Sequence, residues 1–252
     1  MKHFLLAMLM TASMAWAGDS GGQASGSSEL DAVALVRAVE TQYQGERSHG
    51  KMRMHIKTRS WNRMLELEMW SEGREKLLTR ILAPVKERGT CTLKVDDDIW
   101  NYISRIDRLI KIPSSLMGDS WMGSHLTNDD LVKENKVDKL YQLAITERVG
   151  KDVTITGKPL PDAAVVWGKI VYKIDTASLT PLLVEYYDEE DVKVRSMVFS
   201  DFKQIDQRWL PMISRIVPED KPGEFTEMQY LEIDFSVELP RDLFSIKSLR
   251  NR

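Results

Sequence analysis

The 252-residue chain has a single cysteine, Cys91, and therefore cannot form an intramolecular disulfide. Its interior has no apolar run near the roughly 18 residues that a membrane-spanning helix needs. The formal net charge is −3, which gives no electrostatic reason to expect nucleic-acid binding. These shortages exclude a disulfide-stapled scaffold, a helical membrane protein and a basic nucleic-acid binder.

Residue patterns for catalysis are also missing. The three histidines behind the N-terminal leader are His49, His55 and His125, and none lies in a nucleophile elbow or an HExxH spacing. His125 could titrate functionally, although a role in packing its loop is the favoured interpretation. The acidic run at 96–98 lacks the spaced ligands, glycine and distal glutamate of a calcium loop, so it predicts a solvated hairpin turn. We expect no enzyme, no metal site and no cofactor.

The N-terminus predicts export. After a basic start, residues 4–10 form a short apolar stretch, and Ala15-Trp16-Ala17 supplies a small-residue cleavage site, so residues 1–17 are interpreted as a signal peptide. No cysteine lies immediately after this site to be lipidated, since Cys91 is far along the chain. Residues 18–28 are rich in glycine and serine and predict a flexible linker. Residues 29–252 are then expected to form one domain of a periplasmic protein.

Hydrophobic periodicity predicts one helix followed by many strands. Apolar residues recur at helical spacing from Glu29 to Gln44, where Ser28 and Asp31 resemble a capping box and Gly45 predicts the helix end. The period changes to two in 51–60 and 63–72, whose outward positions are basic and acidic respectively, so we expect cross-strand ion pairs. Further strand segments are predicted at 76–82, in a meander at 88–112, and at 141–149, 152–158, 165–175, 182–187, 192–202, 209–217 and 224–235.

We predict a mainly β fold with about eleven strands and a few short helices. Successive hairpins imply one antiparallel sheet, and a sheet of this size curls strongly because strand twist accumulates. The helices are too few to cover it with a second layer. The expected architecture is therefore a strongly curved, unclosed half-barrel with a helical lid over its concave face.

The loop from Pro113 to Leu126 is unusually apolar for a connection, so it must cover either the protein's own core or a ligand. A capping box is predicted directly after it, at Thr127 and Asp130, and starts a short helix. Methionine, which suits surfaces that adapt to variable apolar partners, is abundant in the strands. Ordinary core packing explains the methionines equally well on composition alone, but a curled sheet with little helical cover favours a groove for acyl chains.

Several motifs point to a known family. They are Trp61-x-Arg63, Arg80-Ile81-Leu82-Ala83-Pro84-x-Lys86-Glu87-Arg88-Gly89-Thr90, Trp100-Asn101-Tyr102, Ile110-Lys111-Ile112-Pro113 and Gly118-x-Ser120-Trp121-Met122-Gly123-Ser124-x-x-Thr127-Asn128-Asp129-Asp130-Leu131. With them the chain resembles the outer-membrane lipoprotein-sorting (LolA-like) family over about residues 30–246. The resemblance implies an open β half-barrel with a lid over an apolar cavity. It also implies a non-catalytic carrier of lipid or lipoprotein acyl chains, partnered by an inner-membrane transporter.

We therefore predict a periplasmic carrier, expected to be monomeric, that shields the acyl chains of lipoproteins or lipids and moves them toward the outer membrane. The alternative is a non-catalytic accessory subunit of an inner-membrane transporter or envelope complex. The lid is predicted to comprise Leu116, Met117, Trp121, Met122 and Leu126, with Gly118 and Gly123 as hinges. The predicted cavity wall comprises Met52, Met54, Ile56, Leu65, Leu67, Met69, Ile81, Leu93 and Val95.

Overall fold

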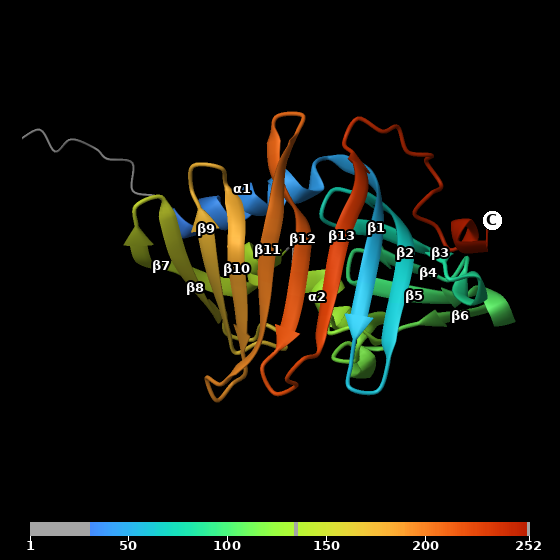
Figure 1. Ribbon diagram of the computed structural model, residues 1–252, viewed down its shortest axis with the longest axis horizontal. Helices are drawn as coiled ribbons and strands as arrows, with labels where there is room; N and C mark the ends of the chain where they lie inside the picture. The colour runs from blue at the N-terminus through green and yellow to red at the C-terminus, as the bar shows by residue number, and fades with distance from the viewer. Residues whose placement is uncertain (1–30, 134–135, 251–252) are drawn as a thin grey trace, which may run out of the picture.

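The computed structural model describes residues 31–133 and 136–250. The predicted signal peptide (1–17) and linker (18–28) lie outside this range. In the described residues, one antiparallel sheet contains thirteen strands, in the order β6-β5-β4-β3-β2-β1-β13-β12-β11-β10-β9-β8-β7 (Figure 1). The strands are β1 (Arg47–Lys57), β2 (Asn62–Glu72), β3 (Lys76–Ala83), β4 (Cys91–Val95), β5 (Asp98–Ile103), β6 (Arg108–Lys111), β7 (Tyr141–Val149), β8 (Asp152–Pro159), β9 (Lys169–Asp175), β10 (Thr180–Tyr187), β11 (Lys193–Ile205), β12 (Arg208–Pro218) and β13 (Phe225–Asp234). The helices are α1 (Ala32–Gln44), α2 (Asn128–Lys133) and α3 (Val137–Leu140), with short 3-10 turns η1 (Val85–Glu87), η2 (Ser104–Ile106), η3 (Ser114–Leu116), η4 (Trp121–Gly123) and η6 (Lys247–Arg250).

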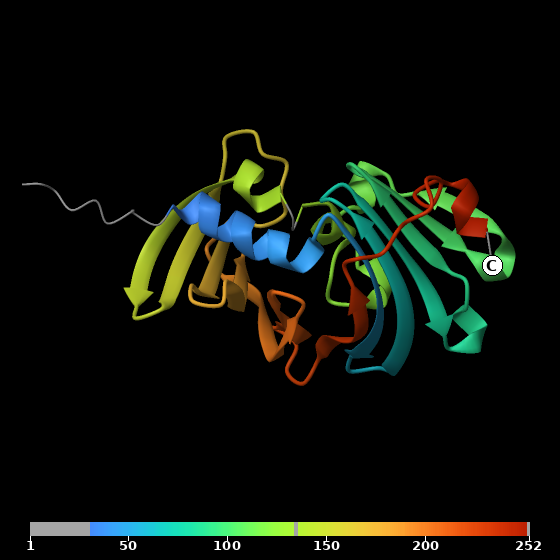
Figure 2. The ribbon, with the colours of Figure 1, turned by 90° about the horizontal axis from the view of Figure 1, so that it is seen from above.

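The sheet is curved and unclosed, as predicted, although it has thirteen strands rather than about eleven. Its two edge strands, β6 and β7, lie at opposite ends of the strand order. Seen from above, the sheet curls around α1, which lies across the concave side (Figure 2). This curvature leaves a hollow on the concave side, which α1, α2, α3 and the loop before α2 help to cover.

The α1 helix begins later than predicted. Asp31 is its N-cap and accepts a hydrogen bond from Val33 N at 3.1 Å, while Ser28 of the predicted capping box lies outside the described residues. Gly45 ends the helix, because its φ of 59° is readily adopted only by glycine and its N–H bonds to Thr41 O. The buried face of α1 consists of Ala32, Leu35, Val36 and Val39.

Strands β1 and β2 show the predicted alternation. Met52, Met54 and Ile56 are buried on β1, and the positions between them face outward. The expected cross-strand ion pairs also form, since Arg53 meets Glu66 at 3.4 Å on the neighbouring strand. Such exposed pairs contribute at most about 1 kcal/mol each, so they fix strand register more than stability.

The sheet carries a hydrophobic core on each of its two faces. The larger core fills the concave side beneath α1. A smaller core lies on the other face of β3, β4 and β5, where the C-terminal segment covers it with Leu249. Cys91 is buried in this second core, as predicted, and burial raises the pKa of its thiol. The apolar pattern of β4 therefore points away from the concave side.

Candidate ligand-binding site

The concave side contains a cavity of about 240 Å³. One water molecule needs only about 10–15 Å³ of such space, so the cavity is large enough for an organic guest. Its walls come from α1, the loop before α2 and the inner faces of strands in both halves of the sheet. Its apolar lining includes Met52, Met69, Trp121, Met197, Phe199 and Met228.

The predicted cavity wall falls into three groups. Met52 and Met69 line the cavity. Five others are fully buried in the core that surrounds it: Met54, Ile56, Leu65, Leu67 and Ile81. Leu93 and Val95 belong instead to the core on the opposite face, so their assignment to the cavity wall is corrected.

Strand register explains this correction. On the concave side, Met69 pairs with Thr79, and Thr79 pairs with Thr92 of β4. Since neighbouring residues of a strand face opposite ways, Leu93 points to the convex side. There it packs with Leu78 of β3 and with the C-terminal segment. The predicted alternation of β4 is therefore correct, but its apolar side chains pack in the second core and not in the concave one.

Part of the cavity lining comes from strands that the predicted wall did not include. These residues lie on β9 to β13, at the inward positions of the alternating segments in the second half of the chain: Tyr172, Val184, Met197, Phe199, Met228 and Tyr230. The surplus of methionine was the available signal, because Met197 and Met228 belong to it. The predicted wall took its residues from the first half alone.

The loop before α2 closes the cavity through Trp121. This side chain is 3% exposed, lines the cavity and donates a hydrogen bond from Nε1 to Thr92 Oγ1 at 3.1 Å. Its backbone N–H donates to Leu126 O at 2.8 Å, and Leu126 also lines the cavity. Met122 is partly buried against the core. Leu116 is exposed and Met117 is half-buried, so the part of the predicted lid before Gly118 contacts solvent more.

The two predicted hinges differ in conformation. Gly123 has a φ of 73°, and a Cβ there would lie 3.5 Å from the Trp61 ring. Gly118 has ordinary φ, and a Cβ there would meet nothing within 4 Å. The backbone therefore requires glycine at Gly123 but not at Gly118. Hinge motion at either position stays a prediction.

The capping box at the start of α2 forms as predicted. Thr127 N donates to Asp130 Oδ2 at 2.6 Å, and Asp130 N donates to Thr127 Oγ1 at 3.1 Å. The sequence pattern indicates no other role for Asp130. In the structure, Arg195 of β11 donates to both carboxylate oxygens of Asp130, at 2.7 and 2.9 Å, and to His125 O at 2.7 Å. Arg195 thus ties the loop and α2 to the sheet.

The Arg195–Asp130 pair is enclosed. Both side chains are about 5% exposed or less, and Asp130 also accepts from Trp167 Nε1 at 3.2 Å. The guanidinium lies over two rings, 4.4 Å from Trp167 and 4.2 Å from Tyr186. Contacts between a desolvated guanidinium and aromatic faces are stabilising. Burial and aromatic packing thus hold Arg195 in one position against the loop.

His125 has a packing role, as favoured from the sequence. Its backbone N and Nδ1 both lie near Thr226 Oγ1, at 3.0 and 2.9 Å, and its Nε2 lies 3.2 Å from Glu224. The side chain therefore attaches the end of the loop to β13. This gives the loop a third attachment, besides Thr92 on β4 and Arg195 on β11.

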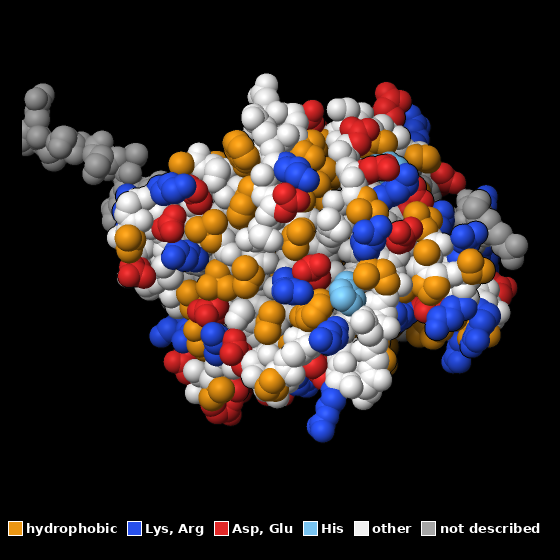
Figure 3. All heavy atoms as spheres, viewed as in Figure 1, with side chains coloured by type: hydrophobic (Ala, Val, Ile, Leu, Met, Phe, Trp, Pro, Cys, Tyr) orange, Lys and Arg blue, Asp and Glu red, His pale blue; other side chains and the backbone are white. Residues whose placement is uncertain are grey.

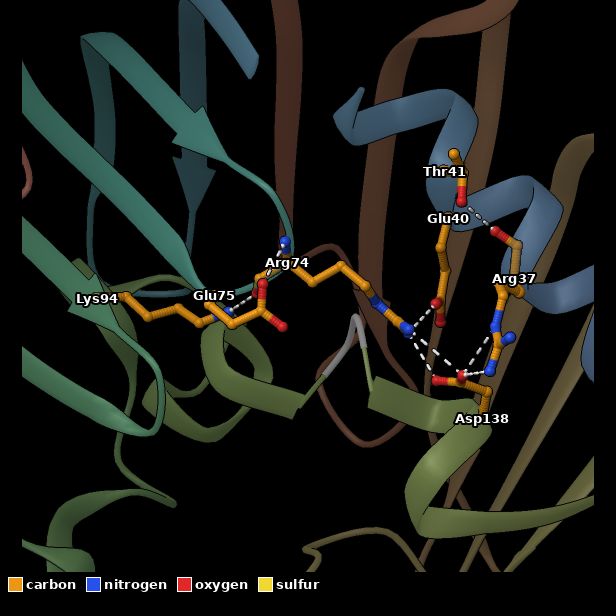
Figure 4. A network of polar contacts seen from close by, with 7 residues as sticks. All are labelled: Arg37, Glu40, Thr41, Arg74, Glu75, Lys94 and Asp138. Carbon is orange, nitrogen blue, oxygen red and sulfur yellow. Dashed lines mark hydrogen bonds and ion pairs between the residues drawn. The ribbon is translucent and has the colours of Figure 1, made fainter. Parts of the chain in front are cut away.

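A polar network joins α1, α3 and the sheet at the rim of the cavity (Figure 4). Arg74, in the β2–β3 turn, forms ion pairs with Glu40 of α1 and with Asp138 of α3, the latter at 2.7 Å. Arg37 of α1 also meets Asp138, at 2.8 Å. The buried Lys94 donates to Arg74 O at 2.8 Å. Since Glu40 and Arg74 also line the cavity, the network fixes α1 in place over it.

Acid should weaken this network at Asp138. Burial alone would raise the pKa of the Asp138 carboxyl, but hydrogen bonds from Arg74 and Arg37 outweigh it and lower the pKa. The stabilisation is present above the unfolded value of about 3.9 and is lost as pH falls through the lower folded value. Asp138→Asn should unfold about 1–3 kcal/mol more easily at neutral pH and show a flatter acid dependence.

Urea denaturation over a pH series measures this effect. Asp220→Asn, in an exposed turn, is the matched control and should follow the wild type. An Asp138→Asn curve parallel to that of the wild type between about pH 4 and 2 would contradict the prediction.

The described residues contain no group of three or more His, Cys, Asp or Glu side chains placed to hold a metal ion. Among the same residues, no helix is long and apolar enough to cross a membrane. What the structure does show is an apolar cavity under a helix and an anchored loop.

Solved structures share the whole fold. An outer membrane lipoprotein-sorting protein domain from Vibrio parahaemolyticus is 22% identical, with 87% of this chain and 98% of that chain covered at a TM-score of 0.76. A DUF1329 family protein from Desulfovibrio piger is also 22% identical (86% and 97% covered, TM-score 0.78). A LolA superfamily protein from Nitrosomonas europaea is 15% identical (87% and 100% covered, TM-score 0.72). The chain therefore has the LolA-like half-barrel fold that its motifs predicted.

A family model described as "Uncharacterized protein" matches residues 73–251, and the chain belongs to that family. No curated protein matches the chain significantly.

Proposed function

We propose that this chain is a periplasmic carrier that shields the acyl chains of lipoproteins or lipids and moves them toward the outer membrane. The apolar cavity beneath α1 and Trp121 carries the proposal. Methionines from both halves of the sheet line it, and their flexible side chains suit guests of variable shape. Each buried CH₂ of a guest contributes about 0.8 kcal/mol, so a few carbons give measurable affinity.

In this proposal the loop 114–126 acts as the lid. Opening releases Trp121 from Thr92 and exposes the cavity, and closure returns the indole over the bound chain. Transfer then follows differences in affinity between donor, carrier and acceptor, and needs no reaction in this chain. The family resemblance adds partnership with an inner-membrane transporter. We expect the carrier to be monomeric. The same resemblance supports a role without catalysis or cofactor.

Filling the cavity should remove binding. Ser214 of β12 lines the cavity between Phe199 and Met228 on the neighbouring strands, so Ser214→Phe places a ring inside it. The affinity for a fluorescent acyl-chain probe should fall about tenfold or more, because the ring takes the space of several CH₂ groups. Titration of the probe by fluorescence measures this change.

Ser200→Phe is the matched control. Ser200 follows Phe199 on β11, so its side chain points to the opposite face of the sheet and is exposed. It should bind the probe like the wild type. Equal affinity in Ser214→Phe and the wild type would count against the cavity as the binding site. Native mass spectrometry adds a second check: a protein that carries no lipid even after incubation with vesicles would favour the accessory-subunit alternative.

A further inference from the structure

One end of the molecule is built from two adjacent turns. η1 connects β3 to β4, and η2 connects β5 to β6. The turns lie side by side, because Ser104 Oγ donates to Arg88 O at 2.6 Å and Gly89 faces Ser104 Cβ. Figure 2 shows this end at the far side of the sheet from the start of α1, beside the C-terminal segment. We refer to residues 85–88 and 104–111 as the tip.

The tip exposes aliphatic side chains. Val85 on η1 is 76% exposed, the highest value among the large hydrophobic residues that the structure describes, and Ile106 on η2 is 55% exposed. Single exposed aliphatic residues are ordinary on protein surfaces. Here two of them lie on neighbouring turns at one end of the sheet.

Cations surround these two side chains. The tip carries only two acidic residues, and both are paired: Glu87 with Arg63, and Asp107 with Arg250 at 3.1 Å. The whole chain has a net charge of −3, so the positive charge of this end is opposite in sign to that of the molecule as a whole. Figure 3 shows Lys and Arg side chains gathered at this end of the molecule. Four exposed cations lie on or next to η1 and η2: Lys86, Arg88, Arg105 and Arg108. The fifth cation of the tip, Lys111, lies further along β6 and forms an ion pair with Asp98 at 2.8 Å.

We propose that the tip docks on a bilayer surface that carries anionic phospholipid. Val85 and Ile106 enter the boundary between headgroups and acyl chains, while the surrounding cations meet lipid phosphates. Protruding aliphatic residues ringed by Lys and Arg have the composition of interfacial membrane anchors. Each cation held near an anionic surface strengthens binding about fivefold. An anionic bilayer offers both an apolar layer and phosphates, so it matches the two kinds of side chain that the tip exposes.

The tip also contacts the loop over the cavity through one side chain. Arg63 pairs with Glu87 of η1 and donates to Met122 O of η4 at 2.8 Å. Docking would therefore place the loop 114–126 close to the membrane. The idea that docking gives a carrier access to its donor or acceptor rests on the proposed function. Docking itself can be measured separately.

Co-sedimentation with vesicles tests the proposal. The protein should bind vesicles that contain phosphatidylglycerol, bind poorly to pure phosphatidylcholine, and release as salt rises. The double variant Val85→Ser/Ile106→Ser should bind about tenfold more weakly. The triple variant Lys86→Gln/Arg105→Gln/Arg108→Gln should bind these vesicles about a hundredfold more weakly. Arg88 is left intact because its Nε donates to Leu82 O and supports the turn.

Matched controls lie elsewhere on the surface. Val149 and Val192 are 67% and 59% exposed, so Val149→Ser/Val192→Ser removes similar apolar surface far from the tip in sequence. Lys57→Gln/Lys158→Gln/Lys221→Gln removes the same charge from exposed positions. Both controls should bind vesicles like the wild type. Equal binding to both vesicle types, or equal losses in tip and control variants, would overturn the proposal.

Acyl-probe affinity, measured in parallel, separates the two proposals. The tip variants should keep the probe affinity of the wild type. If the protein binds vesicles but not the probe, the carrier proposal is contradicted and the docking proposal stands. If it binds the probe but shows no preference for phosphatidylglycerol, only the docking proposal is contradicted. If no vesicle binds and the tip residues are needed to bind an acidic protein instead, the tip is a protein-binding surface and the membrane proposal is wrong.

Discussion

Replacing Arg195 by methionine should destabilise the protein by about 3–5 kcal/mol, because it leaves the Asp130 carboxylate charged and buried without its partner. The wild-type guanidinium supplies two hydrogen bonds to Asp130 and one to His125 O. It also packs over the rings of Trp167 and Tyr186, which contact each other. Methionine keeps most of the volume and loses the charge. Urea denaturation measures the loss.

The control for Arg195 is an arginine of the same sheet whose ion pair is exposed. Arg215 meets Glu227 at 3.2 Å with 46% of its side chain exposed, so Arg215→Met should cost about 1 kcal/mol or less. In the double variant Arg195→Met/Asp130→Asn, the carboxylate is neutral, and the cost should be smaller than the sum of the single losses. A stability for Arg195→Met within 1 kcal/mol of the wild type would show that the pair does not hold the loop.

Replacing Trp121 by alanine should cost about 3–5 kcal/mol of stability and accelerate release of an acyl probe about tenfold or more. The indole is 3% exposed, forms part of the cavity wall and donates to Thr92. Its removal opens the cavity beneath the loop and detaches the loop from β4. Stopped-flow dilution of the loaded protein measures the release rate.

Two further substitutions separate the contributions of Trp121. Trp121→Phe keeps a ring over the cavity and loses the hydrogen bond, so it should cost only about 1 kcal/mol and change release little. Trp209→Ala removes an indole that is 43% exposed on the surface and should leave release unchanged. If Trp121→Ala carries and releases the probe as the wild type does, the loop is not a lid.

Local patterns predicted the parts of the fold that local physics decides. The alternation in β1 and β2 gives the correct inward faces, because both strands are buried on one side only. Gly45 and the Thr127–Asp130 capping box mark helix ends through bonds between near neighbours in sequence. The strong curvature follows from the number of strands, whatever their order.

Features that depend on distant segments could not be predicted in the same way. Leu93 faces outward because a C-terminal segment, more than a hundred residues later, supplies an apolar partner on that side. Arg195 stands at an inward position between apolar neighbours, and only its contact with Asp130, 65 residues away in sequence, explains it. In both cases the alternation of inward and outward residues is visible in the sequence. The residues that Leu93 and Arg195 contact, however, are set by tertiary structure.

The central pairing of β1 with β13 has a consequence for how the molecule holds together. Strands β1 to β6 form one half of the sheet and β7 to β13 form the other. Each half packs against the chain end that adjoins the opposite half. The α1 segment, which precedes β1, crosses to pack on β7 and β12, whereas the segment after β13 crosses to cover β3, β4 and β5. Truncation at either terminus should therefore destabilise the half of the sheet on which that terminus packs. We therefore expect the two halves of the sheet to unfold as one cooperative unit.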